Sequence, residues 1–275
     1  MLPGDRLGDP EDILKTPQTT LFGKDVEIYD LSHPFGKDTP LWPYFDDVEI
    51  NRIHYHAKSR VLSQELKHTM HVSTHADSPA HVEEDYPFTD ELPVGMYMGD
   101  GVVVDIPKDK WEKVTAEDLE NAEPEIREGD MVIVNTGWHE YWGDNTKYFS
   151  FAPGFYEEAG EWFVEKGVKG VGIDTQALDH PLATKEAQSF GDGDNPVLPW
   201  LVDAYERETG RTVEEDFPYW EPCHRLLLTN GIAGYENVGG DIDEVTGERV
   251  TIMGVPLRWE KGDGSIVRLL ALKEK

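Results

Sequence analysis

The chain has 275 residues, a formal net charge of −30 at pH 7 and a sequence pI near 4.5. This charge disfavours nucleic acid and anionic membranes as partners, because both require a basic surface. No apolar run reaches the roughly 18 residues of a membrane span, and the N-terminus lacks the cationic and apolar regions of a secretory signal, so we expect a cytoplasmic protein.

The first half of the chain reads as a series of strands. Residues 1–25 are rich in Pro and Gly and are expected to form an exposed lead-in, and residues 26–275 are expected to form a single domain. Alternating or apolar runs bounded by turn residues predict strands at 26–32, 47–56, 99–107 and 129–138. A threonine followed by acidic residues predicts that a helix starts at Thr115.

The second half alternates helix and strand. Pro153 is predicted to open a helix that ends at Gly167, and residues 168–174 read as a buried strand. This order of helix, glycine and strand indicates an α/β domain. Residues 182–221 are expected to be an insertion, with a flexible stretch at 191–196 and a short helix at 199–210. The runs 249–259 and 265–273 are predicted to be β-rich.

The stretch HVSTHADSPAHV, residues 71–82, carries the strongest chemical signal. In an extended chain its imidazoles and carboxylate share one face, at the odd positions, while small apolar residues share the other. Ten extended steps span roughly 33 Å, so either the chain bends or the site holds two ions. Two ions about 3.5–4 Å apart could share the carboxylate of Asp77. Nitrogen and oxygen donors favour Zn²⁺ or Mn²⁺.

A second polar pair, His224 and Glu236, permits two local structures. Asn230-Gly231 could form a tight hairpin turn, which would place His224 and Glu236 on opposite faces. Alternatively, Pro222 starts a short helix that Asn230-Gly231 ends, and a strand leads to Glu236. The helix would allow His224 to turn toward Glu236.

The stretch at residues 71–81 resembles the H-x-G-T-H-x-D-x-P-x-H signature of the cyclase family of metal-dependent hydrolases. This family includes bacterial kynurenine formamidase, isatin hydrolase and a metal-dependent dienelactone hydrolase. Ser73 stands where the family usually has Gly, a change that is tolerated if the backbone there needs no positive φ. The stretches 28–43, 132–138, 170–181 and 224–237 are also similar, and the last of them favours the helix before Glu236.

The resemblance implies a fold, a set of site residues and an assembly. The fold would be an α/β single domain of the kynurenine formamidase-type swivelling β/β/α class, with a mixed central sheet or barrel and flanking helices. One or two Zn²⁺ or Mn²⁺ ions would be bound, and Asp77 would bridge two of them. The implied ligands are His71, His75 and Asp77 for the first ion, with His81, His224 and Glu236 completing a second site or moving protons. The protein would be a homodimer or homotetramer.

The activity implied is hydrolysis of an amide, formamide, lactam or ester/lactone bond in a small aromatic or cyclic substrate, with His81 or Glu236 protonating the leaving group. Four aromatic side chains could line the substrate site or belong to the core: Trp42, Tyr44, Trp138 and Trp142. Two alternatives stay open, namely a metal-assisted lyase or cyclase-dehydratase on the same site, and a non-catalytic metal-binding protein with a closed site.

The dispersed acidic residues generate a prediction about salt. Like charges on one surface repel each other, and salt shortens the range of that repulsion from about 10 Å at 0.1 M to about 3 Å at 1 M. We therefore expect the thermal midpoint to rise between low and about molar salt, as in a protein adapted to a saline source. Scanning calorimetry across that range checks this, and a flat or falling midpoint would contradict it.

Overall fold

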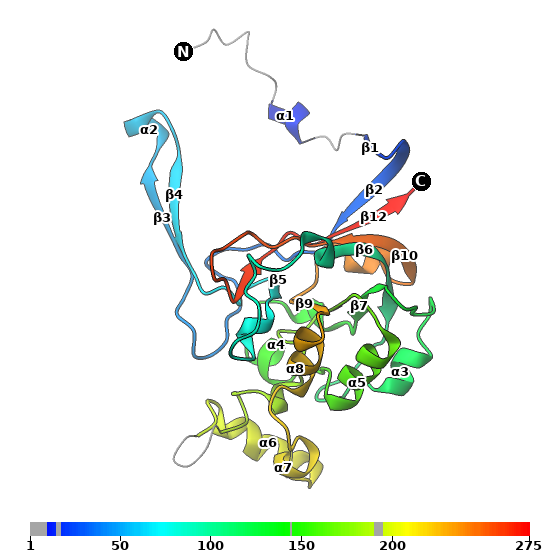
Figure 1. Cartoon of the computed structure of the whole chain (residues 1–275). Helices are drawn as coiled ribbons and strands as arrows, with labels where there is room; N and C mark the ends of the chain where they lie inside the picture. The colour runs from blue at the N-terminus through cyan, green and yellow to red at the C-terminus, as the bar shows by residue number, and fades with distance from the viewer. Residues whose placement is uncertain (1–9, 15–17, 144, 190–194) are drawn as a thin grey trace.

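A ten-stranded mixed sheet forms the centre of the structure, a computed structural model that describes residues 10–14, 18–143, 145–189 and 195–275 (Figure 1). From one edge to the other its strands are β1 (Thr19–Leu21), β2 (Lys24–Asp30), β12 (Leu270–Glu274), β10 (Glu248–Met253), β6 (Met98–Asp105), β7 (Met131–Asn135), β8 (Gly170–Ile173), β9 (Ala233–Glu236), β5 (His75–Asp77) and β11 (Gly264–Ile266). Strands β6, β7, β8 and β9 are parallel, and the other pairings are antiparallel.

The parallel strands are apolar on both faces because both faces are covered. In β6, Val102 and Val104 pack into one hydrophobic cluster and Val103 into another. A strand that is buried on both sides reads as a continuous apolar run rather than an alternating one. The run from Val102 to Val104 therefore predicted the strand correctly, although it showed no period of two.

Helices lie on both sides of the sheet. They are α1 (Pro10–Ile13), α2 (His56–Ser59), α3 (Ala116–Glu120), α4 (Asn145–Ser150), α5 (Glu157–Lys166), α6 (Pro199–Thr209), α7 (Val213–Asp216), α8 (Pro222–Thr229) and α9 (Ile242–Val245). Residues of α3, α5 and α8 share a core with β6, β7 and β8, and residues of α9 share the opposite core. The expected α/β single domain, with a large mixed sheet and flanking helices, is confirmed. No helix in the described ranges is long and apolar enough to cross a membrane.

Two parts of the chain lie outside the two main cores. Strands β3 (Glu49–His54) and β4 (Ser63–Lys67) form a separate two-stranded sheet that projects from the body, with α2 at its tip (Figure 1). Helices α6 and α7 contribute to a third hydrophobic cluster, at the end of the molecule opposite this hairpin. They fall within residues 182–221, the stretch that we expected to be an insertion, and α6 fits the short helix predicted at 199–210.

The start of α5 differs from the prediction. Pro153 was expected to open this helix, but the helix begins at Glu157. The backbone before it is already engaged: Phe155 N–H donates to the carbonyl of Leu178 at 3.0 Å, and the carbonyl of Gly154 accepts from Val114 at 3.0 Å. A Cβ at Gly154 would lie 2.7 Å from His180 Cα, so the chain passes too close to its neighbour there to turn into a helix.

The N-terminal boundary also differs in part. The described part of the expected lead-in includes β1, which pairs with β2, so residues 19–25 already belong to the sheet edge. Residues 1–9 and 15–17 lie outside the described residues, as does most of the stretch 191–196 that was expected to be flexible. The extent of the domain and the insertion at 182–221 stay predictions.

Candidate metal centre

The chain bends within residues 71–82, which is one of the two alternatives that the length of the extended stretch left open. Only His75–Asp77 form a strand, and Pro79–His81 form a 3-10 turn. Ser73 has φ +55°, in the left-handed region that favours glycine. The condition under which Ser73 could replace Gly without strain, a backbone that needs no positive φ, is therefore not met. The bend brings His71 Nδ1 within 2.7 Å of Asp77 Oδ1, although the two residues are six positions apart.

The pairing of β5 with β9 sets the centre of the site. His75 lies directly opposite Glu236 in this antiparallel pair, at the carboxyl end of the parallel strands. Ligand sites in α/β sheets usually lie outside these strand ends. His75 Nε2 is 3.3 Å from Glu236 Oε2. Residues that are 161 positions apart thus meet because of strand register alone.

The region around His224 adopts the helical alternative. Helix α8 starts at Pro222 and ends at Thr229 with Asn230 as its C-cap, Gly231 has φ +74°, and β9 follows. His224 Nε2 lies 2.7 Å from Glu236 Oε1 and 3.6 Å from Asp77 Oδ2. All six residues that the resemblance implied as ligands or proton carriers are therefore part of one cluster.

Asp77 is shared by two groups of potential ligand atoms. One consists of His71, Asp77 and His81, and the other of His75, Asp77 and Glu236; within each group the atoms lie within 4.8 Å of one another. The resemblance implied a different division, with His71 and His75 on the same ion. A bridging position for Asp77 is compatible with the geometry.

The buried polar atoms of the site fit a cation. His75 Nδ1 donates to the carbonyl of Ser73 at 2.8 Å, which leaves Nε2 facing the carboxylates. His75 Nε2 and Asp77 Oδ2 are buried, and neither has a hydrogen-bond partner among the described residues, although His75 Nε2 lies 3.3 Å from Glu236 Oε2. Buried polar groups in proteins are normally hydrogen-bonded, so two unpartnered ligand atoms side by side indicate space for an ion. Imidazole and carboxylate donors suit Zn²⁺ or Mn²⁺.

Charges compensate one another within the cluster. Burial by itself lowers the pKa of His71, but Asp77 and Asp263 outweigh it and raise that pKa to about 9. Burial is likewise outweighed at His75, where Asp77 and Glu236 raise the pKa to about 10. Burial and Asp77 act to raise the pKa of Glu236, but His224 and His75 bring it down to about 2. An ion that binds here takes the place of these protons, so binding releases them.

Two aspartates that sequence reasoning did not single out hold the imidazoles in place. Asp179 accepts hydrogen bonds from the backbone N–H groups of Cys223 and His224 and lies 2.7 Å from His224 Nδ1. Asp263 Oδ2 lies 3.0 Å from His71 Nε2. Carboxylates behind an imidazole fix its orientation and raise its basicity. The sequence contained a weak indication that Asp179 belongs to the site, because this residue follows a predicted strand. The residues around Asp263 contained no such indication.

His81 occupies the exposed side of the cluster. Its ring stacks on that of His71, with centroids 3.8 Å apart, and it is the only member of the two groups that is exposed. Loss of water around the ring, and the positive charge of His71, lower the pKa of His81 to about 4. The ring is therefore neutral at pH 7 and can accept a proton.

The four candidate aromatic residues separate into two kinds. Trp42 and Trp138 are buried and pack in a cluster with Tyr148 and Phe149. Tyr44 is 45% exposed and stacks on Trp42, with centroids 5.9 Å apart. Trp142 stacks flat on His33, with centroids 4.0 Å apart. Tyr44 thus has the freest ring of the four, and contact of any of them with a substrate stays a prediction.

Two further polar side chains were missed. Gln176 and Glu186 are fully buried, and none of their side-chain nitrogen and oxygen atoms has a hydrogen-bond partner among the described residues. Gln176 lies between Thr175, whose carbonyl accepts from Asn237, and Leu178, whose N–H donates to Glu236. Burial raises the pKa of Glu186 to about 8. Nothing in the flanking sequence distinguishes these side chains from surface residues.

Comparisons with known proteins show a family and relatives to which the chain is similar. Residues 29–180 match the model of the family described as "Putative cyclase". A kynurenine formamidase of Bacillus cereus is 23% identical over 89% of this chain and 97% of its own length. An isatin hydrolase of Roseibium aggregatum is 24% identical over 94% of this chain and 90% of its own length. A crystal structure of an isatin hydrolase bound to the product analogue thioisatinate shares the fold, with a TM-score of 0.72, 24% identity, and coverage of 91% of this chain and 93% of that chain.

The cluster predicts a loss of bound metal in two variants. His75→Ala and Asp77→Asn each remove a ligand atom from the centre, so we expect metal content to fall by at least tenfold, since even partner residues behind the ligands typically contribute 10–100-fold in affinity. Elemental analysis of the purified proteins measures this. His56→Ala, at an exposed histidine in the hairpin tip, is the control. Unchanged stoichiometry in His75→Ala or Asp77→Asn would refute the ligand assignment.

The raised pKa of Glu186 leads us to expect that the stability of the protein depends on pH. Its pKa is about 8 in the folded protein and near 4.5 when the chain is unfolded, so only the unfolded state loses this proton between those values. This carboxyl therefore lowers the free energy of unfolding as pH rises from about 4.5 to 8, by up to ~1.4 kcal/mol per pH unit. Glu186→Gln should remove that contribution and stabilise the protein most near pH 8.

Urea unfolding of wild type and Glu186→Gln at pH 5, 6, 7 and 8 measures the difference. The control is Glu165→Gln, at an exposed position of α5. A stability difference between Glu186→Gln and wild type that does not change with pH would show that Glu186 is ionised in the folded protein.

Proposed function

The chain belongs to the cyclase family, and on that premise we propose that it is a metal-dependent hydrolase of an amide, formamide, lactam or lactone bond in a small aromatic or cyclic substrate. Two relatives that align over most of their length are a kynurenine formamidase and an isatin hydrolase. Both names describe hydrolysis of a carbon–nitrogen bond, in a formamide and in a cyclic amide. We propose the same reaction type here, with the exact substrate left open between these classes.

The observation that carries this proposal is the shared position of Asp77 between two groups of buried ligand atoms, with His75 Nε2 and Asp77 Oδ2 unpartnered. His71, His75, Asp77 and Glu236 would hold one or two Zn²⁺ or Mn²⁺ ions, with His81 or His224 as further ligands. Such an ion lowers the pKa of water toward ~7 and polarises a carbonyl oxygen. His81 is exposed, and an exposed residue at the site fits an open catalytic centre better than it fits a closed structural metal site.

Proton transfer is assigned to His81 rather than to Glu236. His81 is on the exposed side of the cluster, stacked on His71, and a neutral ring there could take a proton from the attacking water and pass it to the leaving nitrogen or oxygen. Glu236, with a pKa of about 2 and contacts to His75 and His224, would stay ionised and orient the imidazoles. Asp179 and Asp263 would hold His224 and His71 during turnover.

We propose that the substrate's ring lies near Tyr44. This side chain is partly exposed and stacks on Trp42, and Glu236 and His224 are among the charged groups that act on its hydroxyl. Burial, together with the carboxylates of Glu221 and Glu186, raises the pKa of this hydroxyl, so it stays protonated and can donate a hydrogen bond to a carbonyl oxygen. A planar aromatic ring could stack beside it.

The direct test is turnover of a substrate panel by protein of known metal content. The panel contains N-formyl aromatic amines, isatin-like lactams and aryl lactones, each assayed with the apo protein and after addition of Zn²⁺ or Mn²⁺. Reaction in ¹⁸O-labelled water places one labelled oxygen in the product of hydrolysis. Turnover without solvent oxygen in the product would indicate a lyase instead, and metal binding without any turnover would favour a non-catalytic protein.

His81→Ala separates proton transfer from metal binding. If His81 moves a proton, this variant should keep its metal and lose about 10²–10⁴ in kcat, the usual contribution of general acid–base catalysis. Elemental analysis and steady-state kinetics on the same sample measure both quantities. Loss of metal and activity in equal proportion would instead make His81 a ligand.

A further inference from the structure

The ligand pair of His75 and Glu236 stands at the end of its strand ladder. The antiparallel pairing of β5 with β9 ends with these two residues opposite each other. A pair at the end of a ladder has a paired neighbour on one side only. Beside it, both segments of the chain pass through the left-handed region, with φ +55° at Ser73 and φ +54° at Asn237. The geometry of this ligand pair therefore depends on contacts beyond the ladder.

Asn237, the residue after Glu236, is bonded to three segments that are distant in the sequence. Its N–H donates to the carbonyl of Thr175 at 2.8 Å, and its carbonyl accepts from the hydroxyl of Thr74 at 2.6 Å. Its side-chain Oδ1 accepts from the hydroxyl of Tyr148, in α4, at 3.1 Å. Thr74 and Asn237 would be the next pair of the ladder, so the Thr74 hydroxyl extends the ladder through a side chain.

These contacts form a closed circuit. The N–H of His33 donates to Thr74 Oγ1 at 2.9 Å. The ring of His33 stacks flat on Trp142, with centroids 4.0 Å apart, and Trp142 meets the ring of Tyr148 edge-on, with centroids 5.2 Å apart. Tyr148 leads back to Asn237 and Asn237 to Thr74. We call these five residues the Asn237 network: Thr74, His33, Trp142, Tyr148 and Asn237.

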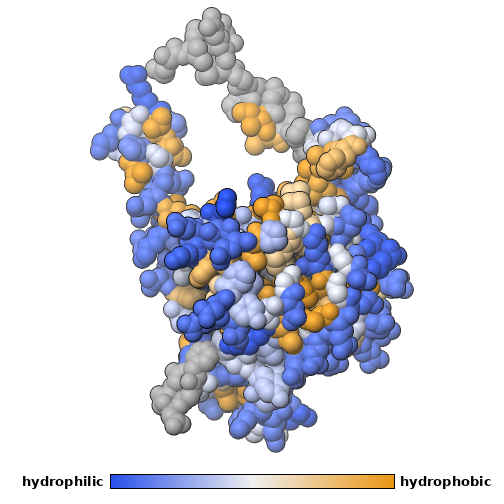
Figure 2. Space-filling view, in the orientation of Figure 1, coloured by the Kyte–Doolittle hydropathy of each residue, from blue (hydrophilic) through white to orange (hydrophobic). Residues whose placement is uncertain are grey.

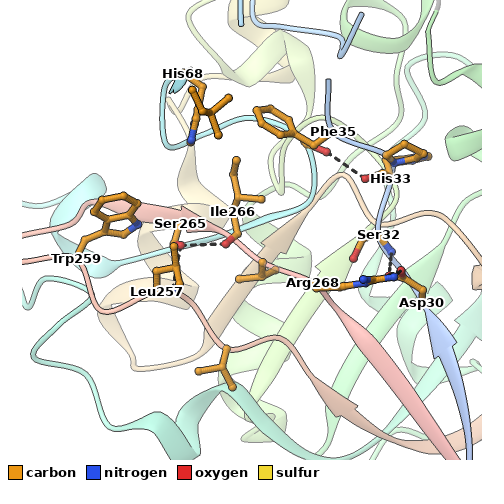
Figure 3. Close-up of a pocket in the computed structure, with 15 residues that line it drawn as sticks. Asp30, Ser32, His33, Phe35, His68, Leu257, Trp259, Ser265, Ile266 and Arg268 are labelled. Carbon is orange, nitrogen blue, oxygen red and sulfur yellow. Dashed lines mark hydrogen bonds and ion pairs between the residues drawn. The ribbon is translucent and has the colours of Figure 1, made fainter. Parts of the chain in front are cut away.

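The network borders a cavity on one side and is closed to water where its hydroxyls lie. His33 and Ser73 help to line a cavity of about 880 Å³, and Figure 3 shows His33 among the lining side chains. On the outer surface, much of which is hydrophilic in Figure 2, water can replace a lost hydrogen bond. Thr74, Tyr148 and Asn237 are only 0–4% exposed, so a partner removed there leaves the other group unsatisfied.

From these contacts we infer that Tyr148 is a positioning residue of the proposed metal centre: its hydroxyl fixes the turn at Asn237 and thereby directs the carboxylate of Glu236. The inference rests on the proposed binding of a metal by Glu236. Ligands that are already held in place bind a metal more tightly than ligands that must first be ordered. The second acceptor of the Tyr148 hydroxyl, the carbonyl of Asp174, is farther away at 3.3 Å.

The hydroxyl of Tyr148 is also a dependable donor. Burial, together with the negative charges of Asp174 and Glu236, raises the pKa of Tyr148 well above its usual value. The hydroxyl therefore keeps its proton at neutral pH and can donate it to Asn237 whatever the charge of the neighbouring cluster.

The affinity of the apo protein for Zn²⁺, measured by competition with a fluorescent chelator, tests this role. Tyr148→Phe removes the hydroxyl and keeps the ring in its aromatic cluster, so Zn²⁺ should bind about tenfold more weakly, at the lower end of the 10–100-fold effect of partners behind metal ligands. The matched control is Tyr156→Phe, at a buried tyrosine of the third hydrophobic cluster whose hydroxyl bonds to the backbone of Tyr219. The control should lose stability and keep the wild-type affinity.

Asn237→Gly supplies an independent measurement. Glycine adopts the left-handed region readily, so this change removes the acceptor of the Tyr148 hydroxyl and leaves the turn allowed. If the hydroxyl acts through Asn237, the double variant Tyr148→Phe with Asn237→Gly should bind Zn²⁺ about as weakly as the weaker of the two single variants. Two losses that multiply would show independent roles and overturn the proposal.

Circular dichroism and thermal melting show whether each variant is folded. A folded Tyr148→Phe protein with the wild-type affinity, or an equal loss of affinity in Tyr156→Phe, would overturn the positioning role and leave the metal centre in place. Should Tyr148→Phe fail to fold, Asn237→Gly alone must weaken Zn²⁺ binding, and a wild-type affinity in that variant overturns the proposal. A wild type that binds neither Zn²⁺ nor Mn²⁺ would refute the metal centre itself, and the role of Tyr148 with it.

Discussion

The pairing of β5 with β9 is the constraint on which the site depends. Strand pairing fixes which residues face each other, and a slip by one residue would turn every side chain to the opposite face. In the observed register His75 faces Glu236, and Asp77 faces Gly234, whose lack of a side chain leaves room for Leu178 beside it. The N–H of Leu178 in turn donates to Glu236. One register thus positions a ligand pair and a backbone donor to its carboxylate.

Charge compensation explains why so many ionisable groups can be buried together. An isolated buried carboxylate or imidazolium is expensive, but opposite charges in contact with further hydrogen bonds recover much of that cost. Asp77 and Glu236 lie among His71, His75 and His224, and Asp179 and Asp263 stabilise the imidazoles from behind. A divalent cation that bound here would take the place of protons, because imidazole and carboxylate groups bind metals in their deprotonated forms. Gln176 and Glu186 are buried without hydrogen-bond partners for their side chains among the residues that the structure describes.

Residue type and spacing over a few positions specify the local features of this protein, namely the motif from His71 to His81 and the buried strands at 102–104 and 170–173. The same local signals permitted either a hairpin or a helix before Glu236, and the fold adopts helix α8. Tertiary structure decided what depends on distant partners. Asp263 meets His71 across 192 positions, Ser73 adopts a positive φ because the chain must return toward Asp77, and α5 starts late because Phe155 is bonded to Leu178. The burial of Glu186 and the exposure of the hairpin likewise depend on which surfaces the fold leaves covered or open, and local sequence carries no record of that.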